Sequence, residues 1–198
     1  MQALIVVDAQ NEFSSDGLRP VPKHAQALSR IEDHIRRVRK NMWPIAWVRH
    51  FNKPNESKAF VKGTWGAELS PGLGPKAGFG PETIFEKDVY GAFTGTGLES
   101  WLRANDVSQV LIVGFYTHGC ISTSAREALV RGFDVSVDLN ATGATDMKHH
   151  LLGEQTADEV RRFALLHLAN MGVTIAYSGE AEHVDPAEIP TLNESVGA

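Results

Sequence analysis

The sequence contains a single cysteine and no apolar run approaching the roughly 20 residues that cross a bilayer. One cysteine cannot form a disulfide within the chain, so we expect a reducing, cytoplasmic location. The segment Met1–Asp8 also lacks the basic lead and the small-residue cleavage site of a signal peptide, and is typical of a strand instead. These absences predict a protein without a membrane partner.

Basic residues are also few. The chain carries 19 Lys and Arg against 24 Asp and Glu, which gives a net charge of −5 and a pI near 5.9. A nucleic-acid partner would require clustered Lys and Arg. The one basic cluster, Arg36–Lys40, lies at the end of a predicted helix, where it complements the helix dipole. We therefore expect a small-molecule substrate and no nucleic acid.

Hydrophobic residues make up 42% of the 198-residue chain, which suits one well-buried core and is short for two domains. Short, continuous apolar runs alternate with helical patterns, as in parallel strands that helices cover on both faces. The predicted strands are Ala3–Asp8, Pro44–His50, Thr83–Lys87, Val107–Gly114, Phe133–Leu139 and Val173–Tyr177. The predicted helices are Lys23–Lys40, Gly97–Ala104, Cys120–Arg131 and Gln155–Met171. We expect one α/β domain over residues 1–180, a doubly wound (Rossmann-like) fold, and a polar tail at residues 181–198.

A long segment, residues 51–81, lacks regular patterning and is rich in Gly and Pro. Loops of this length in a compact domain are usually functional or disordered. Trp65 and Phe79 give the segment apolar groups to bury, so we expect a partly ordered cover over the site.

Cys120 follows the apolar run that ends at Gly114, after a short turn, and a helix is predicted to begin there. A helix N-terminus lowers the pKa of a thiol, which raises the fraction of nucleophilic thiolate. A lone buried cysteine is also the commonest state of a free thiol. This segment alone leaves both interpretations open.

Asp8 and Lys87 end two other apolar runs. In doubly wound sheets, ligands bind beyond the carboxyl ends of the strands, so both side chains can meet Cys120 there. A carboxylate can take the thiol proton, and an ammonium can stabilise the thiolate. Taken singly, Asp8 also fits a cap or turn residue and Lys87 a solvated strand end.

Three segments together resemble the isochorismatase-like cysteine hydrolase superfamily, which includes nicotinamidases, N-carbamoylsarcosine amidases, ureidoacrylate amidases and isochorismatases. They are Val6–Phe13 (VVDAQNEF), Glu86–Phe93 (EKDVYGAF) and Gly114–Ala128 (GFYTHGCISTSAREA). Their order and spacing match from about residue 2 to residue 177. The resemblance implies a parallel six-stranded sheet with helices on both faces.

The resemblance also implies roles for individual residues. Cys120 matches the nucleophile, Asp8 the acid/base, and Lys87 the lysine that holds both and stabilises the thiolate. A non-proline cis peptide is expected at Phe115–Tyr116. It would direct the backbone N–H groups of Tyr116 and Cys120 at the oxyanion.

Two departures from the family pattern stand out. Many relatives have an acidic residue where this chain has His118, which we expect to change the contacts near the turn without a catalytic role. Nicotinamidases bind a metal through an Asp-x-His pair and a later His, whereas Val48–Pro54 contains only His50, with no Asp-x-His pair, and no second His lies between His50 and Lys87. We expect no catalytic metal.

Substrate specificity is the least determined part of the sequence. His50 can hydrogen-bond substrate or simply end a strand, and the aromatic residues can form a pocket or pack in the core. The candidate substrate-binding residues are Phe13, His50, Trp65, Tyr90, Phe93 and Tyr116. Of the other histidines, His149 and His150 are expected in a solvated loop and His167 on a half-buried helical stripe.

The sequence therefore predicts a metal-independent cysteine hydrolase that cleaves a C–N bond of a small amide, ureido or carbamoyl compound. Two alternatives stay open: an isochorismatase-type vinyl-ether hydrolase and a non-catalytic binding module with the same fold. We expect no cofactor. By resemblance, we expect a homo-oligomer, either a dimer or a tetramer.

Overall fold

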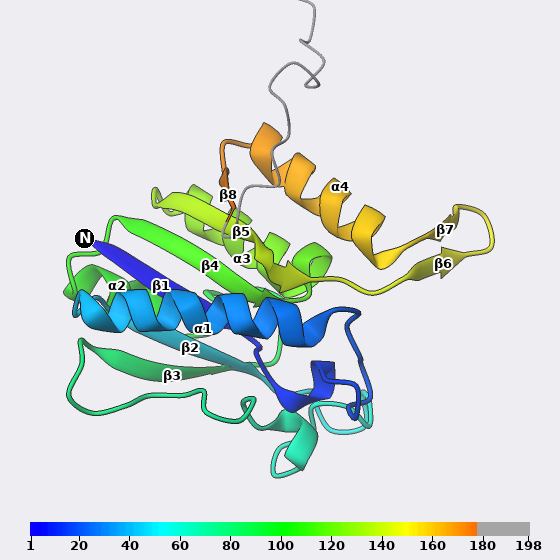
Figure 1. The fold of residues 1–198 in the computed structure, drawn as a ribbon, viewed down its shortest axis with the longest axis horizontal. Helices are drawn as coiled ribbons and strands as arrows, with labels where there is room; N and C mark the ends of the chain where they lie inside the picture. The colour runs from blue at the N-terminus through cyan, green and yellow to red at the C-terminus, as the bar shows by residue number, and fades with distance from the viewer. Residues whose placement is uncertain (178–198) are drawn as a thin grey trace, which may run out of the picture.

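The computed structural model describes residues 1–177 of the chain, so the predicted tail lies outside the described residues. Six parallel strands form one sheet in the order β3-β2-β1-β4-β5-β8 (Figure 1). The strands are β1 Gln2–Val7, β2 Ile45–His50, β3 Glu82–Lys87, β4 Gln109–Phe115, β5 Asp134–Gly143 and β8 Thr174–Ala176. The predicted doubly wound α/β fold is confirmed.

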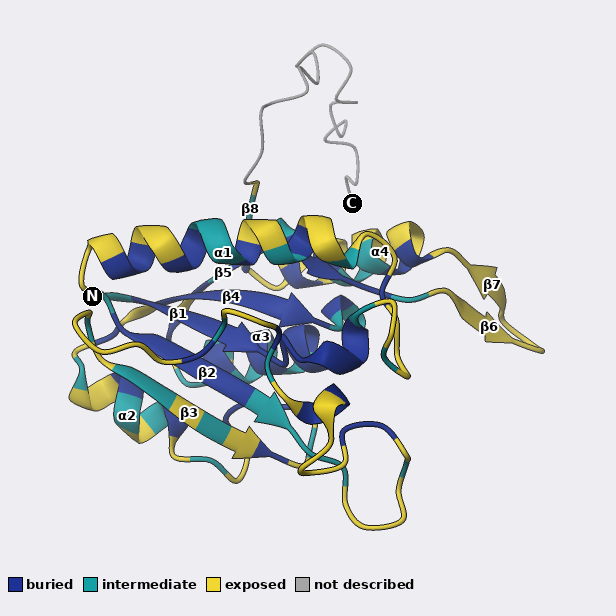
Figure 2. Cartoon of the chain, turned by 60° about the horizontal axis from the view of Figure 1, so that its bottom comes forward, coloured by how far each residue is buried: buried dark blue, intermediate teal, exposed yellow. Residues whose placement is uncertain are grey.

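Four α-helices cover the two faces of the sheet. They are α1 His24–Lys40, α2 Leu98–Ala104, α3 Ser122–Val130 and α4 Ala157–Asn170. The apolar stripe of α1 packs on one face, while α2, α3 and α4 contribute to the core on the other. The central strands are therefore buried on both sides, and the outer faces of the helices stay exposed (Figure 2). This arrangement explains the continuous apolar runs of β1 and β4.

The order of the strands reverses at β1. The chain proceeds from β1 to β2 and β3 on one side, and then returns to place β4 on the other side of β1. Such a switch point opens a crevice at the carboxyl ends of the strands, where α/β proteins bind ligands. β1 and β4 are very close there, since a Cβ atom on Gly114 would lie 1.8 Å from the Val7 carbonyl oxygen.

Two features of the fold differ from the sequence-based expectations. Residues 147–155 form an antiparallel hairpin of β6 Met147–His149 and β7 Gly153–Gln155, which projects beyond the sheet (Figure 1). His149 therefore ends a strand, whereas only His150 lies in the connecting turn. The hairpin was missed because its short, polar strands carry no apolar alternation.

The second difference is at Cys120. The helix predicted from Cys120 is preceded by a π-helical turn, η3 Thr117–Ile121, and α3 begins at Ser122. Cys120 thus lies inside the π-helical turn. Single π-helical turns are frequent at functional sites.

The long segment 51–81, which we call the cover, is held by other residues than expected. Trp65 and Phe79 are exposed at 55% and 42%, while Ala59, Phe60 and Ala67 of the same segment are buried. The segment includes a short 3₁₀ helix, η2 Trp65–Ala67, and contacts a second one, η1 Asn11–Phe13. The ring of Phe60 lies 5.2 Å from that of Phe13, and backbone polar groups also fix the position of the cover.

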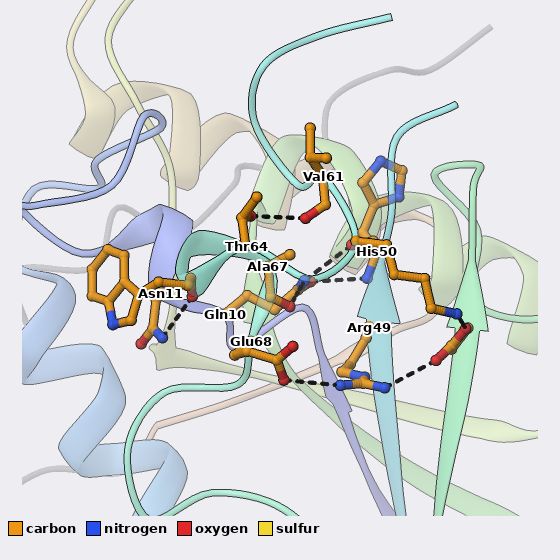
Figure 3. Close-up of polar contacts among 11 residues, drawn as sticks. Gln10, Asn11, Arg49, His50, Val61, Thr64, Ala67 and Glu68 are labelled. Atoms are coloured by element: carbon orange, nitrogen blue, oxygen red, sulfur yellow. Dashed lines mark hydrogen bonds and ion pairs between the residues drawn. The ribbon is translucent and has the colours of Figure 1, made fainter. Parts of the chain in front are cut away.

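Gln10 provides much of that attachment. Its fully buried amide donates to the backbone carbonyls of His50 (3.0 Å) and Ala67 (2.7 Å) and accepts from the His50 N–H (2.8 Å; Figure 3). Asn11 adds a bond to the carbonyl of Trp65 at 2.9 Å. Together these bonds join the end of β1 to the end of β2 and to the cover.

Gln10→Ala is expected to lower the free energy of unfolding by about 2 kcal/mol, because it leaves buried backbone groups without partners. Urea unfolding monitored by circular dichroism measures the change. Gln26→Ala, on the exposed face of α1, is the matched control and is expected to stay within about 0.5 kcal/mol. An equal effect of both substitutions would contradict this role of Gln10.

No helix among residues 1–177 is both long enough and apolar enough to cross a membrane.

Candidate active site

Lys87 brings the three residues of the proposed triad together. It is the last residue of β3, and its ammonium donates to Asp8 Oδ2 at 2.7 Å and to Cys120 Sγ at 3.3 Å. The Lys87 and Asp8 side chains are 0% and 1% exposed. Residues separated by 79 and 33 positions in the sequence thus share one buried site.

Each of these side chains is placed by the end of a strand. Asp8 follows β1 with a positive φ of 54°, which turns the chain out of the sheet. Lys87 lies opposite His50 in the register of β2 and β3. Cys120 follows β4 after the Phe115–Tyr116 bond, which is cis as expected.

Asp8 keeps one oxygen free for chemistry. Its Oδ2 accepts from Lys87, while its buried Oδ1 has no hydrogen-bond partner within residues 1–177. A buried carboxylate oxygen without a donor is unfavourable unless a substrate or the thiol supplies one. Oδ1 is therefore the atom available to take and return a proton.

The electrostatics of Cys120 differ from the sequence-based expectation. Burial raises the pKa of the Cys120 thiol, and the neighbouring Asp8 carboxylate raises it further, whereas the Lys87 ammonium offsets only part of the increase. The expected lowering of this pKa by a helix N-terminus is wrong, because the charges and burial at this site outweigh it. Cys120 is therefore a neutral thiol at neutral pH.

Lys87 remains an ammonium. Burial alone would lower the pKa of Lys87, but attraction to Asp8 and Cys120 raises it above its usual value. The ammonium also donates to the Val89 carbonyl at 3.1 Å and contacts His50 Nδ1 at 3.3 Å. Lys87 is thus a fixed positive charge between a potential base and a potential nucleophile.

Both ring nitrogens of His50 have protein partners. Nδ1 faces Lys87, and Nε2 lies 2.8 Å from Asn52 Oδ1. Asn52 in turn donates to the Ala59 carbonyl at 2.8 Å. The structure therefore gives His50 a positioning contact with Lys87 and leaves no nitrogen free for substrate.

These contacts also bear on the metal that nicotinamidases of the superfamily carry after the second strand. A lone pair that faces an ammonium cannot also bind a cation, so His50 and Asn52 do not fit a metal-ligand pair. Within residues 1–177, no group of three or more His, Cys, Asp or Glu side chains is placed to hold a metal ion. No step of the chemistry below uses a metal.

The candidate substrate-binding aromatics divide into two groups. Phe13 and Phe93 are 2% and 4% exposed and pack in the two cores, so core packing accounts for both rings and their assignment to the pocket stays a prediction. Tyr116 is half-buried, with its ring 4.8 Å from that of Phe13 and 5.1 Å from that of His118. Burial lowers the pKa of His118, so its imidazole is neutral at neutral pH.

Tyr90 and Trp65 are the exposed members of the set. Tyr90 is 68% exposed, and its ring lies 3.6 Å from where a Cβ atom of Gly119 would be. It therefore borders the π-helical turn of the nucleophile. Trp65 lies in the cover, in η2, with its side chain largely exposed.

Sequence reasoning missed several residues that shape this site. Besides Gln10 and Asn52, Glu12 is buried, and its carboxylate accepts from the Phe60 N–H (3.0 Å) and the Leu18 N–H (2.7 Å). A signal was present, since the polar run Gln10-Asn11-Glu12 directly follows a strand and precedes an aromatic residue.

Comparisons with known proteins agree with the geometry. The chain is 32% identical over 169 residues to a nicotinamidase/pyrazinamidase of Mycobacterium tuberculosis, covering 74% of this chain and 89% of that protein. It is 31% identical over 144 residues to the secreted isochorismatase effector Isc1 of Verticillium dahliae, covering 73% of each.

Among solved structures, an isochorismatase from Pseudomonas putida superposes with a TM-score of 0.81 at 26% identity, covering 89% of this chain and 87% of that one. The sequence matches the isochorismatase domain over residues 2–176, nearly all of the described chain. With the strand order and the matched segments, this shows that the chain belongs to the isochorismatase family of hydrolases.

Proposed function

We propose that the protein hydrolyses a C–N bond of a small amide, ureido or carbamoyl compound through a thioester on Cys120, without a metal or other cofactor. The observation that carries the proposal is the ammonium of Lys87, which lies 2.7 Å from Asp8 and 3.3 Å from Cys120. That arrangement joins a base, a fixed cation and a thiol at one buried site.

In the first half of the reaction, Asp8 takes the proton of the Cys120 thiol and the sulfur attacks the carbonyl carbon. A C–S bond forms, and the carbonyl electrons move onto oxygen. The backbone N–H groups of Tyr116 and Cys120 donate to this oxyanion. The oxyanion then collapses, the C–N bond breaks, and the nitrogen leaves with the proton held by Asp8.

In the second half, water attacks the thioester and passes a proton to Asp8. The C–S bond breaks, the acid product leaves, and the proton returns to sulfur. Lys87 stays protonated throughout, stabilises each negative charge that forms on sulfur, and keeps the Asp8 carboxylate oriented. The raised pKa of Cys120 supports this order of reaction steps, because a thiol that is neutral at rest requires Asp8 as its base.

A cytoplasmic location and a homo-oligomer, either a dimer or a tetramer, form the remainder of the proposal. The domain boundary at residue 180 belongs to it as well.

The direct test is intact-protein mass spectrometry after rapid quenching with a panel of small amides, ureido acids and carbamoyl compounds. We expect an acyl mass on Cys120 and release of ammonia or amine, with neither in Cys120→Ala. Full turnover by Cys120→Ala would rule out nucleophilic catalysis. Pyruvate from isochorismate without ammonia from any amide would favour vinyl-ether hydrolysis, and a thiol inert to all electrophiles would favour a binding module.

A further inference from the structure

Arg19 lies on a loop whose backbone is fixed beside the site. The Arg19 N–H donates to the Glu12 carbonyl at 3.0 Å, and the Val21 N–H donates to the Phe13 carbonyl at 2.9 Å. Gly17 lets this loop approach the backbone of Glu12 closely, because a Cβ atom on Gly17 would lie 2.2 Å from the Glu12 carbonyl oxygen. The loop therefore presents Arg19 from one defined backbone position.

Tyr116 connects this position with the nucleophile. Its hydroxyl donates to the Arg19 carbonyl at 3.0 Å, while its own backbone immediately precedes the π-helical turn that contains Cys120. Arg19 and Cys120 thus lie near the two ends of one tyrosine residue. An extended ligand that runs from the sulfur past the half-buried Tyr116 side chain ends beside Arg19.

Arg19 differs from the cations of the β2–β3 side of the site because it has no acidic partner. Arg49 pairs with Glu68 and Glu86, and Lys62 also pairs with Glu86. The exposed side chain of Arg19 makes no ion pair or hydrogen bond within the described residues. An unpaired guanidinium at a fixed position can bind a carboxylate through two parallel N–H bonds.

We propose that Arg19 binds a carboxylate of the substrate, so that the natural substrate is an amide, ureido or carbamoyl compound bearing a carboxylate about one tyrosine length from its reactive carbonyl. This inference rests on the proposed function, since it uses Cys120 as the reacting atom. It places the acid group of the substrate at the outer end of Tyr116 and the reactive carbonyl at its backbone end.

The electrostatics of Tyr116 agree with this placement. Burial raises the pKa of Tyr116, the charge of Arg19 acts in the opposite direction, and the charge of Cys120 raises it again. The phenol therefore feels the Arg19 guanidinium, and any negative charge that forms on Cys120, and it stays neutral itself at neutral pH. A neutral wall between sulfur and guanidinium does not repel an anionic substrate.

The test compares two alkylating probes that differ only in charge, N-(iodoacetyl)-β-alanine and its carboxamide. Second-order rates of Cys120 labelling are measured by mass spectrometry and divided by the rates with glutathione. We expect the acid to be favoured over the amide, and Arg19→Gln to reduce that preference about tenfold. Arg19→Lys is expected to keep part of this preference, because an ammonium keeps the positive charge but lacks the two parallel N–H donors of the guanidinium.

Arg30→Gln is the matched control, because Arg30 is also exposed but pairs with Asp33 at 3.3 Å on α1. Its preference for the acid is expected to equal that of the unmodified protein. The proposal is overturned by a preference near one, by no change in Arg19→Gln, or by an equal loss in Arg30→Gln. Labelling needs no turnover, so a failure of the proposed hydrolysis is seen separately, as absent ammonia release.

Discussion

Asp8→Asn is expected to lower turnover by about 10⁴-fold while making Cys120 react faster with iodoacetamide at pH 7.5. The two effects have opposite signs because the proposed mechanism gives the carboxylate two roles. As a base it is required to take the thiol proton and to protonate the leaving nitrogen. As a neighbouring negative charge it raises the pKa of the Cys120 thiol, in addition to the increase caused by burial.

Without that charge, the Lys87 ammonium at 3.3 Å is the nearest ionised group to the sulfur, and it favours the thiolate. The midpoint of alkylation against pH is therefore expected to move to lower pH in Asp8→Asn. Stopped-flow alkylation between pH 6 and pH 10 compares the rates of the two proteins at each pH, and ammonia release measures turnover. Asp16→Asn, on an exposed loop, is the matched control and is expected to change neither.

A purely structural Asp8 predicts a different result. Asparagine would then lower alkylation and turnover together, in proportion to the fraction of protein that remains folded. Turnover that persists while alkylation becomes faster would instead show that another group is the base. Only the opposed changes identify Asp8 as both the proton acceptor and the charge that keeps Cys120 neutral.

The sequence predicted the frame of this site well because the frame depends on local patterns. Continuous apolar runs identified the buried strands, and the residues after them, Asp8, Lys87 and Cys120, lie together at the sheet edge. In a doubly wound sheet, the ends of parallel strands meet whatever their separation in the chain. Periodicity therefore sufficed to place the three residues at one sheet edge, whereas their proposed roles came from the family resemblance.

The features of the site that the sequence could not predict depend on contacts between residues that are far apart in the chain. Phe13 and Phe93 look like pocket residues in one dimension, and only packing shows that they fill the two cores. The ionisation of Cys120 depends on burial and on the balance between Asp8 and Lys87, which no local pattern records. No local pattern records the buried contact between His34 on α1 and Asp138 on β5 either, where the two side chains lie 2.6 Å apart.

Lys87→Met is expected to lower the free energy of unfolding at pH 7 by about 3–5 kcal/mol, although methionine fills much of the same volume. The substitution leaves the Asp8 carboxylate buried without its only charged partner, since Oδ1 already lacks one within residues 1–177. The cost comes from the uncompensated charge. Neutralising the Asp8 carboxylate is therefore expected to restore most of the stability that Lys87→Met loses.

The double variant Asp8→Asn/Lys87→Met tests this argument. We expect its stability to return to within about 1–2 kcal/mol of the unmodified protein, a coupling characteristic of a buried ion pair. Urea unfolding of all four proteins at pH 7 measures these free energies. If the two single losses simply add at pH 7, the pair is not coupled, and the positioning of Asp8 by Lys87 loses its physical basis.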